Sequence, residues 1–545
     1  MRFSFLLSTA LVMVLHPVSG AAQTTLDRTD PTLLEERTPE TLPEEADAPV
    51  AVTAERAGPA AGTGSFAVGA VTFAGLEELS QTTFMDVVEP YLGRELSPAD
   101  LSDLVEQVAE RAQRDFPLAT ATIAPQELRA GVLRIQVDEG RVDEVRLEGD
   151  SNGAVLRSLE VLASGRAVTT SALERALLIA GDVDGISLGE ARILREGGRN
   201  ILLVEVRERP FRLWLTFDND STKPLGPLEL FGAARWNGVI GEGDRLEVFS
   251  LLAVPDAQEL LFGRVRYARR ISRSGTELAV TASLSRTEPG SYLADREILG
   301  NSRLAEISLL QPVIRSRRAS MWLESSFSHR RLEQDRAGEL VRRDRLATAK
   351  FGWYGNARFS DARLRVSGEI TRGLDVLGAT EFGDSLASRD DADGTFTSVN
   401  LFADWTQPIA GALGMRLAVR SQFADQPLLV SEEIGLGGAA FVRGYDYRER
   451  SGDEGAMGYG ELHWIFSGIE GLNELEVYGF ADGGEVTNLH GGFGGGSLFS
   501  TGAGLRADVD RHTDAGLEVA VPLSGERYDT ADKTPRVRVS VTRHF

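Results

Sequence analysis

The nine residues FVRGYDYRE at 441–449 place an arginine in a setting that is unusual for a surface charge. Arg443 follows two apolar residues and precedes Gly444 and Tyr445, whereas the charges from Asp446 onward are typical of a solvated loop. Arginine presents a planar fork of donors that matches a carboxylate in bidentate geometry. The sequence therefore indicates either an ordinary surface charge or an ion pair with a carboxylate elsewhere in the chain.

A carboxylate that needs such a partner lies 39 residues later, within LEVYGFADGGEV. Two sets of residues alternate there: Leu475, Val477, Gly479 and Ala481 on one face, and Glu476, Tyr478, Phe480 and Asp482 on the other. If the first set faces lipid, Asp482 points into a lumen, where an unpaired carboxylate is costly. Arg443, on a loop folded into that lumen, would pair with it. The alternative is an Arg443 in water and an Asp482 near a rim, and composition alone does not separate the two.

The chain offers little for catalysis, metal binding or nucleic-acid binding. It has no cysteine, and its six histidines lie far apart without ligand spacing, so we expect no metal site and no cofactor. It contains neither G-x-S-x-G nor H-E-x-x-H. The glycine run at 491–497 lacks the Lys-Ser/Thr ending of a phosphate loop. The net charge of −23 argues against nucleic acid. We therefore expect a protein that is not an enzyme.

The first 22 residues are typical of a secretory signal. Arg2 supplies the positive start, an apolar stretch follows, and Gly20 and Ala22 form a small-residue cleavage site. A buried N-terminal helix is the alternative. No run of 18 apolar residues comes later, so no transmembrane helix is expected. Two classes remain: a soluble periplasmic or secreted protein, and an outer-membrane β-barrel.

Residues 23–64 are rich in Thr, Glu, Pro and Ala and have too few large apolar groups to build a core. They predict a flexible linker. Within it, DPTLLEER at 30–37 favours a short helix, because an aspartate in the capping position precedes a proline.

The next part of the chain contains one small α+β pattern twice. In the first copy, residues 65–140, a strand precedes two helical stretches, and two strands follow. The second helical stretch begins at Ser97, with Asp100 three residues later as in a capping box. The second copy, residues 141–208, repeats the order strand, helix, helix, strand, strand, with its second helix starting near Ser171.

From residue 209 to residue 545 the chain has no convincing helix. It is a succession of strand-length stretches with period-two alternation, separated by clusters of turn residues. So long an uninterrupted run exceeds what two packed sheets usually use, and it fits an antiparallel transmembrane barrel.

The last predicted strand supports a membrane barrel. One of its faces is apolar and ends in an aromatic residue, which is typical of the assembly signal of outer-membrane barrels; this face consists of Val537, Val539, Val541 and Phe545. Arg543 lies on the same face and is the exception to its apolar character, although a strand end can hold a guanidinium at the membrane interface.

Together these motifs resemble a known family, the two-partner secretion transporters of the TpsB type (ShlB/FhaC/HecB), which are relatives of the outer-membrane barrel assembly factors. In that family a VRGY/F motif lies at the tip of the sixth extracellular loop, and its arginine pairs with the aspartate of an F-x-D-x-G motif on the barrel wall. The matching residues are Val442, Arg443, Gly444 and Tyr445, and Phe480, Asp482 and Gly484. The resemblance covers about 65–545.

The resemblance implies a fold and a function. The repeated units would be two periplasmic polypeptide-transport-associated (POTRA) domains, and the barrel would have sixteen strands in the outer membrane. The protein would bind an unfolded, large, β-rich exoprotein of the TpsA type and move it through the pore without ATP. The expected partners are this client, outer-membrane lipids and lipopolysaccharide, and the barrel assembly machinery during biogenesis.

Three other functions stay open on the sequence. An assembly or insertion factor shares both motifs but typically carries more periplasmic units. A plain diffusion pore would not need the periplasmic units. An outer-membrane lipase or protease would need a catalytic motif, which is not found.

Overall fold

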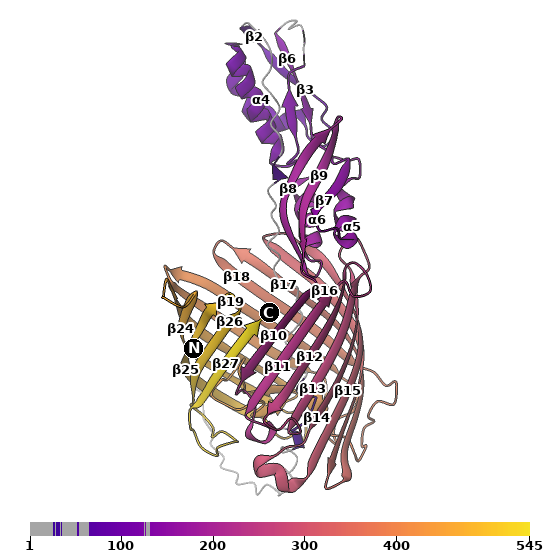
Figure 1. Cartoon of the computed structure of the whole chain (residues 1–545), viewed down its shortest axis with the longest axis vertical. Coiled ribbons are helices and arrows are strands. Elements are labelled where there is room, and N and C mark those ends of the chain that lie inside the picture. The colour runs from indigo at the N-terminus through magenta and orange to yellow at the C-terminus, as the bar shows by residue number, and fades with distance from the viewer. Residues whose placement is uncertain are drawn as a thin grey trace, which may run out of the picture.

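The computed structural model describes residues 26, 27, 29–32, 34, 52–53, 65–124, 126 and 131–545. Two small α+β units form an arm that stands on one end of a closed β-barrel (Figure 1). The expected signal segment and most of the expected linker, including part of its predicted helix, lie outside the described residues. None of the helices in the described part is long and apolar enough to cross a membrane.

The first α+β unit packs one long helix on a small sheet. Its elements are β2 (Phe66–Val68), β3 (Ala70–Ala74), η1 (Gln81–Phe84), α3 (Met85–Val88), η2 (Glu89–Tyr91), β4 (Arg94–Leu96), α4 (Pro98–Gln113), β5 (Thr120–Thr122) and β6 (Val132–Asp138). The sheet order is β3-β6-β5, and β2 pairs with β4. Ser97 and Asp100 form the expected capping box at the start of α4. The apolar face of α4, with Leu104 and Val108, is buried in the core of the unit.

The second unit repeats this plan. It contains β7 (Glu144–Gly149), α5 (Gly153–Leu159), η3 (Glu160–Leu162), α6 (Thr170–Gly181), β8 (Ile186–Glu196) and β9 (Arg199–Glu208). The hydroxyl of Thr169 caps α6 by accepting from the backbone N–H of Ala172, so this helix begins one residue earlier than expected. A short strand from the linker, β1 (Val52–Thr53), pairs in parallel with β8 and extends the sheet to the order β1-β8-β9-β7.

Sixteen antiparallel strands close the barrel, which confirms the predicted fold class. They are β10 (Phe211–Asp218), β11 (Leu228–Asn237), β12 (Asp244–Val254), β13 (Leu260–Arg270), β14 (Glu277–Thr287), β15 (Ile298–Arg315), β16 (Ala319–Arg336), β17 (Glu339–Phe359), β18 (Ala362–Gly373), β19 (Thr397–Ala410), β20 (Leu413–Ala424), β23 (Glu454–Ser467), β24 (Glu474–Thr487), β25 (Gly496–Asp510), β26 (Thr513–Pro522) and β27 (Arg536–His544). The first strand, β10, pairs with the last, β27.

The last strand exposes its apolar face to the outside of the barrel. The exposed fractions of this face are 49 % for Val537, 44 % for Val539, 42 % for Val541 and 63 % for Phe545. Arg543, which interrupts the apolar face, pairs with Asp510 at 3.0 Å near the end of the barrel that carries the arm.

The described residues near the N-terminus do not lie in solvent, although composition predicted a flexible tether. Asp27 pairs with Arg342 of β17 at 2.6 Å, and Thr287 of β14 donates to the carbonyl of Thr29 at 2.8 Å. Leu34 packs into an apolar cluster of the barrel interior. This segment has no core of its own, and it is buried instead against the inner wall of the barrel.

Two arginines at the end of the barrel that carries the arm bind the second α+β unit. Arg315 donates to both carboxylate oxygens of Asp182, at 2.6 and 2.8 Å. Arg270 donates to the carbonyl of Asp182 at 2.5 Å and to that of Ile179 at 2.7 Å. These carbonyls lie at the C-terminal end of α6, where the helix dipole favours positive charge. The arm is therefore docked on the barrel by polar contacts.

Candidate functional site

The candidate site lies where a long loop folds back into the barrel. This loop, residues 425–453, joins β20 to β23 at the end of the barrel away from the arm and is called loop 6. It contains η6 (Val430–Glu432) and a hairpin of β21 (Ile434–Leu436) and β22 (Arg450–Gly452). Its tip, residues 442–445, is buried against the inner faces of β24 and β25.

Arg443 and Asp482 meet at this tip. The Nε of Arg443 and its backbone N–H both donate to Oδ2 of Asp482, at 3.1 and 3.0 Å. The hydroxyl of Ser500 donates to Oδ1 of the same carboxylate. The side chain of Arg443 is 4 % exposed and that of Asp482 is fully buried. The alternative of a solvated Arg443 and a rim Asp482 is therefore wrong.

Two further carboxylates contact the same guanidinium. Its Nη1 lies 3.0 Å from Glu461 of β23 and 3.3 Å from Glu518 of β26. We call Arg443, Glu461, Asp482 and Glu518 the Arg443 cluster. Arg506 of β25 pairs with Glu461 from the other side at 2.8 Å. Since all four members of the cluster are buried, loss of Arg443 would leave three carboxylates facing one another in a site of low dielectric.

Aromatic rings enclose the guanidinium. Its central carbon lies 3.4 Å from the centroid of Phe480 and 4.9 Å from that of Tyr459. A planar guanidinium can stack on such rings while its edge donates to carboxylates, which a lysine ammonium cannot do.

The tip is a tight turn held in a strained conformation. The N–H of Tyr445 donates to the carbonyl of Val442 at 3.1 Å, and Val442 has a φ of 55°, in a region that β-branched residues avoid. A Cβ added at Gly444 would lie 2.7 Å from Cβ of Ser500 and 3.0 Å from the backbone nitrogen of Pro522. Only glycine therefore allows this approach to the wall, and the surrounding contacts maintain the strain.

Loop 8, residues 523–535 between β26 and β27, holds the other side of the tip. The hydroxyls of Tyr445 and Ser524 lie 3.0 Å apart, and Asp446 pairs with Arg527 at 2.6 Å. Tyr445 is fully buried. These contacts join loop 6 to the segment that leads into the last strand.

Gly484 serves packing rather than charge. A Cβ at this position would lie 2.6 Å from Cβ of Met457 and 2.7 Å from Cδ2 of Leu436 in loop 6. The missing side chain lets the β21 end of loop 6 lie flat on the barrel wall.

A second buried arginine holds the base of loop 6. Arg389 comes from loop 5, residues 374–396 between β18 and β19, and its Nη1 lies 2.7 Å from Asp453 and 3.0 Å from Glu433. Asp453 also accepts from the backbone N–H of Leu428 at 2.7 Å. The tip and the base of loop 6 are thus both held by buried ion pairs.

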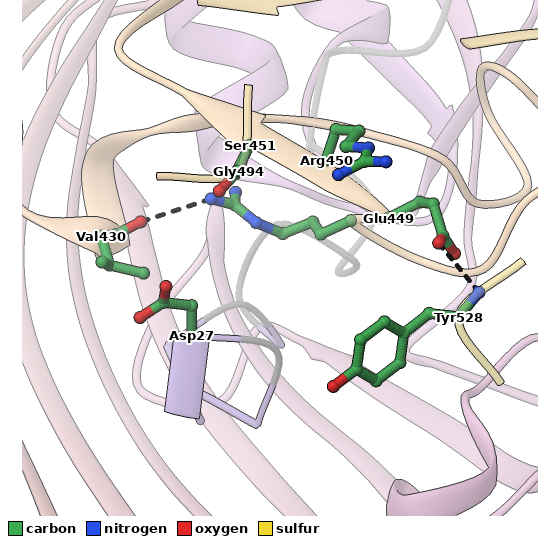
Figure 2. Close-up of a pocket in the computed structure, with 8 residues that line it drawn as sticks. Asp27, Val430, Glu449, Arg450, Ser451, Gly494 and Tyr528 are labelled. Carbon is green, nitrogen blue, oxygen red and sulfur yellow. Dashed lines mark hydrogen bonds between the residues drawn. The ribbon is translucent and has the colours of Figure 1, made fainter. Parts of the chain in front are cut away.

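A cavity lies where loop 6, loop 8 and the N-terminal segment meet (Figure 2). Arg448 donates to the carbonyl of Val430 at 3.3 Å, and Glu449 accepts from the N–H of Tyr528 at 2.9 Å. Asp27 faces the same space, so the N-terminal segment and loop 6 share one chamber. No group of His, Cys, Asp and Glu suited to a metal ion occurs in the part of the chain that the structure describes.

Comparison with known proteins decides the family. The model of the haemolysin secretion/activation proteins ShlB/FhaC/HecB matches residues 197–507, more than half of the chain. The model of the ShlB-type POTRA domain matches residues 66–140. The chain belongs to the ShlB/FhaC/HecB family.

Curated relatives in this family are transporters. The heme/hemopexin transporter protein HuxB of Haemophilus influenzae (strain 86-028NP) is 26 % identical over 392 residues, which cover 70 % of this chain and 69 % of HuxB. The outer membrane transporter CdiB of Escherichia coli O6:K15:H31 (strain 536 / UPEC) is 21 % identical over 476 residues, which cover 84 % of this chain and 79 % of CdiB.

Solved structures show the same fold. CdiB from Escherichia coli matches with a TM-score of 0.71 and 20 % identity, over 98 % of this chain and 100 % of that chain. BamA from Haemophilus ducreyi lacking POTRA domains 1–3 matches with a TM-score of 0.53 and 13 % identity, over 88 % and 100 %. The match to the family models and to the curated transporters, together with this fold, makes the chain an outer-membrane transporter with its POTRA arm in the periplasm. The assembly-factor alternative has less support.

Two members of the Arg443 cluster were not identified from the sequence. Glu461 and Glu518 lie on strands whose alternation is clear. The adjacent Leu462, Leu517 and Val519 are exposed on the outer face, and each glutamate occupies the alternate, buried position that faces the lumen. That pattern could have marked them as inward carboxylates. Nothing in the sequence indicated that they share a partner, because this depends on how strands β23, β24 and β26 curve around loop 6.

Proposed function

We propose that this transporter moves an unfolded, large, β-rich exoprotein of the TpsA type from the periplasm to the cell surface or medium, and that the Arg443 cluster holds loop 6 in the closed lumen between transport events. The observation that carries the proposal is that loop 6 is held inside the barrel by buried ion pairs at its tip and its base. Polar contacts of this kind can be exchanged for contacts with water or client when the loop moves. The apolar side chains of loop 6 that pack on the barrel wall, among them Leu436, Phe441 and Tyr445, would leave it in the same movement.

We propose further that the two units at 65–140 and 141–208 act as POTRA domains that capture the client. An extended chain can add a strand to an exposed sheet edge, where backbone hydrogen bonds give affinity without a strict sequence demand. The β8 edge of the second unit already carries Val52–Thr53. Client and linker would therefore compete for this edge.

The remaining partners follow from the membrane setting. The outward apolar face of β27 would be read by the barrel assembly machinery during biogenesis, and lipids and lipopolysaccharide would surround the folded barrel. No step in this mechanism breaks or forms a covalent bond, so we propose no catalytic residue.

The function is tested by secretion in a host that lacks the gene. Cells would produce a large candidate exoprotein of the TpsA type, with and without the transporter, and the medium would be blotted for it. The proposal requires exoprotein in the medium only when the transporter is present, with an unchanged profile of other outer-membrane proteins. A general loss of outer-membrane proteins without the transporter, and no export with it, would favour an assembly factor instead.

A further inference from the structure

Three arginines stand side by side on the wall of the barrel, on neighbouring strands. Arg303 of β15 is directly opposite Arg331 of β16, and Arg331 is directly opposite Arg345 of β17. Residues directly opposite one another in an antiparallel pair have Cβ atoms about 4.5–5.5 Å apart, and like charges in such positions are destabilising. This row, which we call the arginine ladder, therefore needs a compensating anion.

The arginine ladder faces the outside of the barrel. The alternate residues of β16 and β17 face the lumen, where Gln334 donates to the carbonyl of Leu26 and Arg342 pairs with Asp27. Arg303 and Arg331 are exposed, and Arg345 is half-buried.

The level of the ladder on the wall is set by the apolar residues beside it. Four residues from the ladder toward the arm, on the same face, Ile307 lies opposite Phe327, and these side chains are 47 % and 37 % exposed. Phe351, 48 % exposed, continues the apolar surface on β17. Exposed apolar side chains on a barrel wall face the lipid chains. The ladder therefore lies at the headgroup level, on the side away from the arm, which is the outer leaflet.

Carboxylates on this part of the wall do not balance the arginines. Arg331 pairs with Glu333 at 2.5 Å, and Arg286 of β14 pairs with Glu288 at 3.3 Å. Arg303 and Arg345 have no carboxylate partner among the residues that the structure describes. Arg343, opposite Glu333, adds another positive charge, and Asp335 is a further carboxylate near the hairpin end.

We propose that the arginine ladder binds the phosphate groups of lipid A in the outer leaflet. Guanidinium groups match phosphate oxygens in bidentate geometry, and clusters of arginine next to a membrane-spanning surface bind anionic headgroups. This rests on the proposed contact with lipopolysaccharide and gives that contact a site. It is independent of loop 6, so it can fail while the secretion function stands, and the reverse also holds.

The test compares lipid binding by two purified triple variants in detergent. One is Arg303→Gln, Arg331→Gln and Arg345→Gln. The control removes three exposed arginines from the end of the barrel near the arm: Arg269→Gln, Arg273→Gln and Arg318→Gln. Both lose the same charge. Titration with bisphosphorylated lipid A, followed by native mass spectrometry, should show binding weaker by at least about tenfold in the ladder variant, since charge-assisted contacts are lost, and unchanged in the control.

Two further ligands identify the source of the phosphate. Dephosphorylated lipid A should bind the wild type and the ladder variant equally weakly, and phosphatidylglycerol should not reproduce the difference. Heat-shifted migration on gels checks that each variant is folded. If the triple glutamine variant does not fold, the triple variant Arg303→Lys, Arg331→Lys and Arg345→Lys takes its place. It keeps the positive charge, so its binding of lipid A should weaken less than that of the single variant Arg331→Gln. Equal binding of bisphosphorylated lipid A by ladder and control variants would overturn the proposal, as would an equal dependence on the ladder with phosphatidylglycerol.

Discussion

Arg443 donates twice to one carboxylate oxygen of Asp482, once from its side chain and once from its backbone. The pair therefore fixes the course of the loop 6 backbone as well as a side chain. Because the guanidinium also contacts Glu461 and Glu518, the two partners are not equivalent. Arg443 is the cation that all three carboxylates share, although Glu461 also pairs with Arg506, whereas Asp482 is one of three anions for Arg443.

This inequality predicts an order of effects. Arg443→Ala should release loop 6 more completely than Asp482→Ala, because breaking a buried pair costs about 3–5 kcal/mol and the arginine variant also leaves three carboxylates without their shared partner. Trypsin added to intact cells would measure the release, since Arg448 and Arg450 lie in loop 6. Cleavage should be fastest in Arg443→Ala, intermediate in Asp482→Ala and slowest in the wild type. Equal cleavage of both variants would contradict the shared role of Arg443.

Gly444→Ala should undock the tip without changing any charge. The added methyl group would collide with Ser500 and with the backbone of β26, so the turn cannot keep its place. We expect protease sensitivity close to that of Arg443→Ala. The control is Ala440→Gly, at an exposed position of the same loop. Gly438→Ala would not serve, because Gly438 has a φ of 110°, which strains any other residue. Protection equal to the wild type in Gly444→Ala would show that the close approach is not required.

The docking of the arm predicts a dependence on Asp182. Asp182→Ala should loosen the second unit, because Arg315 is itself buried and would lose both of its contacts to that carboxylate. Distances between spin labels on α5 and on the barrel should broaden in this variant and stay narrow in Glu190→Ala, which removes an exposed acid of the same unit. An unchanged distance distribution in Asp182→Ala would mean that other contacts suffice.

The same interface predicts a pH response. Burial alone would raise the pKa of Asp184, but the charges of Arg245 and of other arginines nearby outweigh it and hold that pKa below its usual value. A carboxylate with a lowered pKa contributes stability that is present above its ordinary pKa, near 4, and is lost as the pH falls through the lowered value. The label distances should therefore stay narrow down to about pH 4 and broaden only below it. Broadening between pH 7 and pH 5 would contradict this assignment.

The pairing of β1 with β8 predicts competition between linker and client. Thr53→Pro removes a backbone donor from the added strand, which should free the β8 edge and strengthen binding of an N-terminal client fragment by roughly fivefold, as expected for one hydrogen bond. Thr53→Ala keeps the donor and should bind like the wild type. Binding to the purified transporter can be followed by fluorescence anisotropy. Weaker or equal binding in Thr53→Pro would argue against competition at this edge.

Much of the fold could be read from local pattern. The alternation in 209–545 and the helix cap at Ser97 depend on residues close in sequence, and the structure confirms both predictions. The position of the described residues 26, 27, 29–32 and 34 could not be predicted in this way. Their composition is that of a solvated tether, and they are ordered by contacts with residues of the barrel interior, among them residues of β14, β16 and β17, hundreds of residues away.

In the candidate site, too, local features could be predicted and long-range contacts could not. The pattern around Asp482 showed which way its side chain points, since alternation on one strand is local. That Glu461 and Glu518 join the same guanidinium depends on the curvature of the barrel and the path of loop 6, which no single strand encodes.

The most direct test of the account is export by Arg443→Ala. The variant and Arg450→Ala, which removes an exposed arginine from the same loop, would each be produced with the exoprotein in a host without the wild-type gene. Heat-shifted gels would establish equal amounts of folded barrel, and the medium would be blotted. The account predicts loss or strong reduction of export in Arg443→Ala and normal export in Arg450→Ala. Wild-type export from Arg443→Ala, at equal levels of folded barrel, would contradict the central role of the Arg443 cluster.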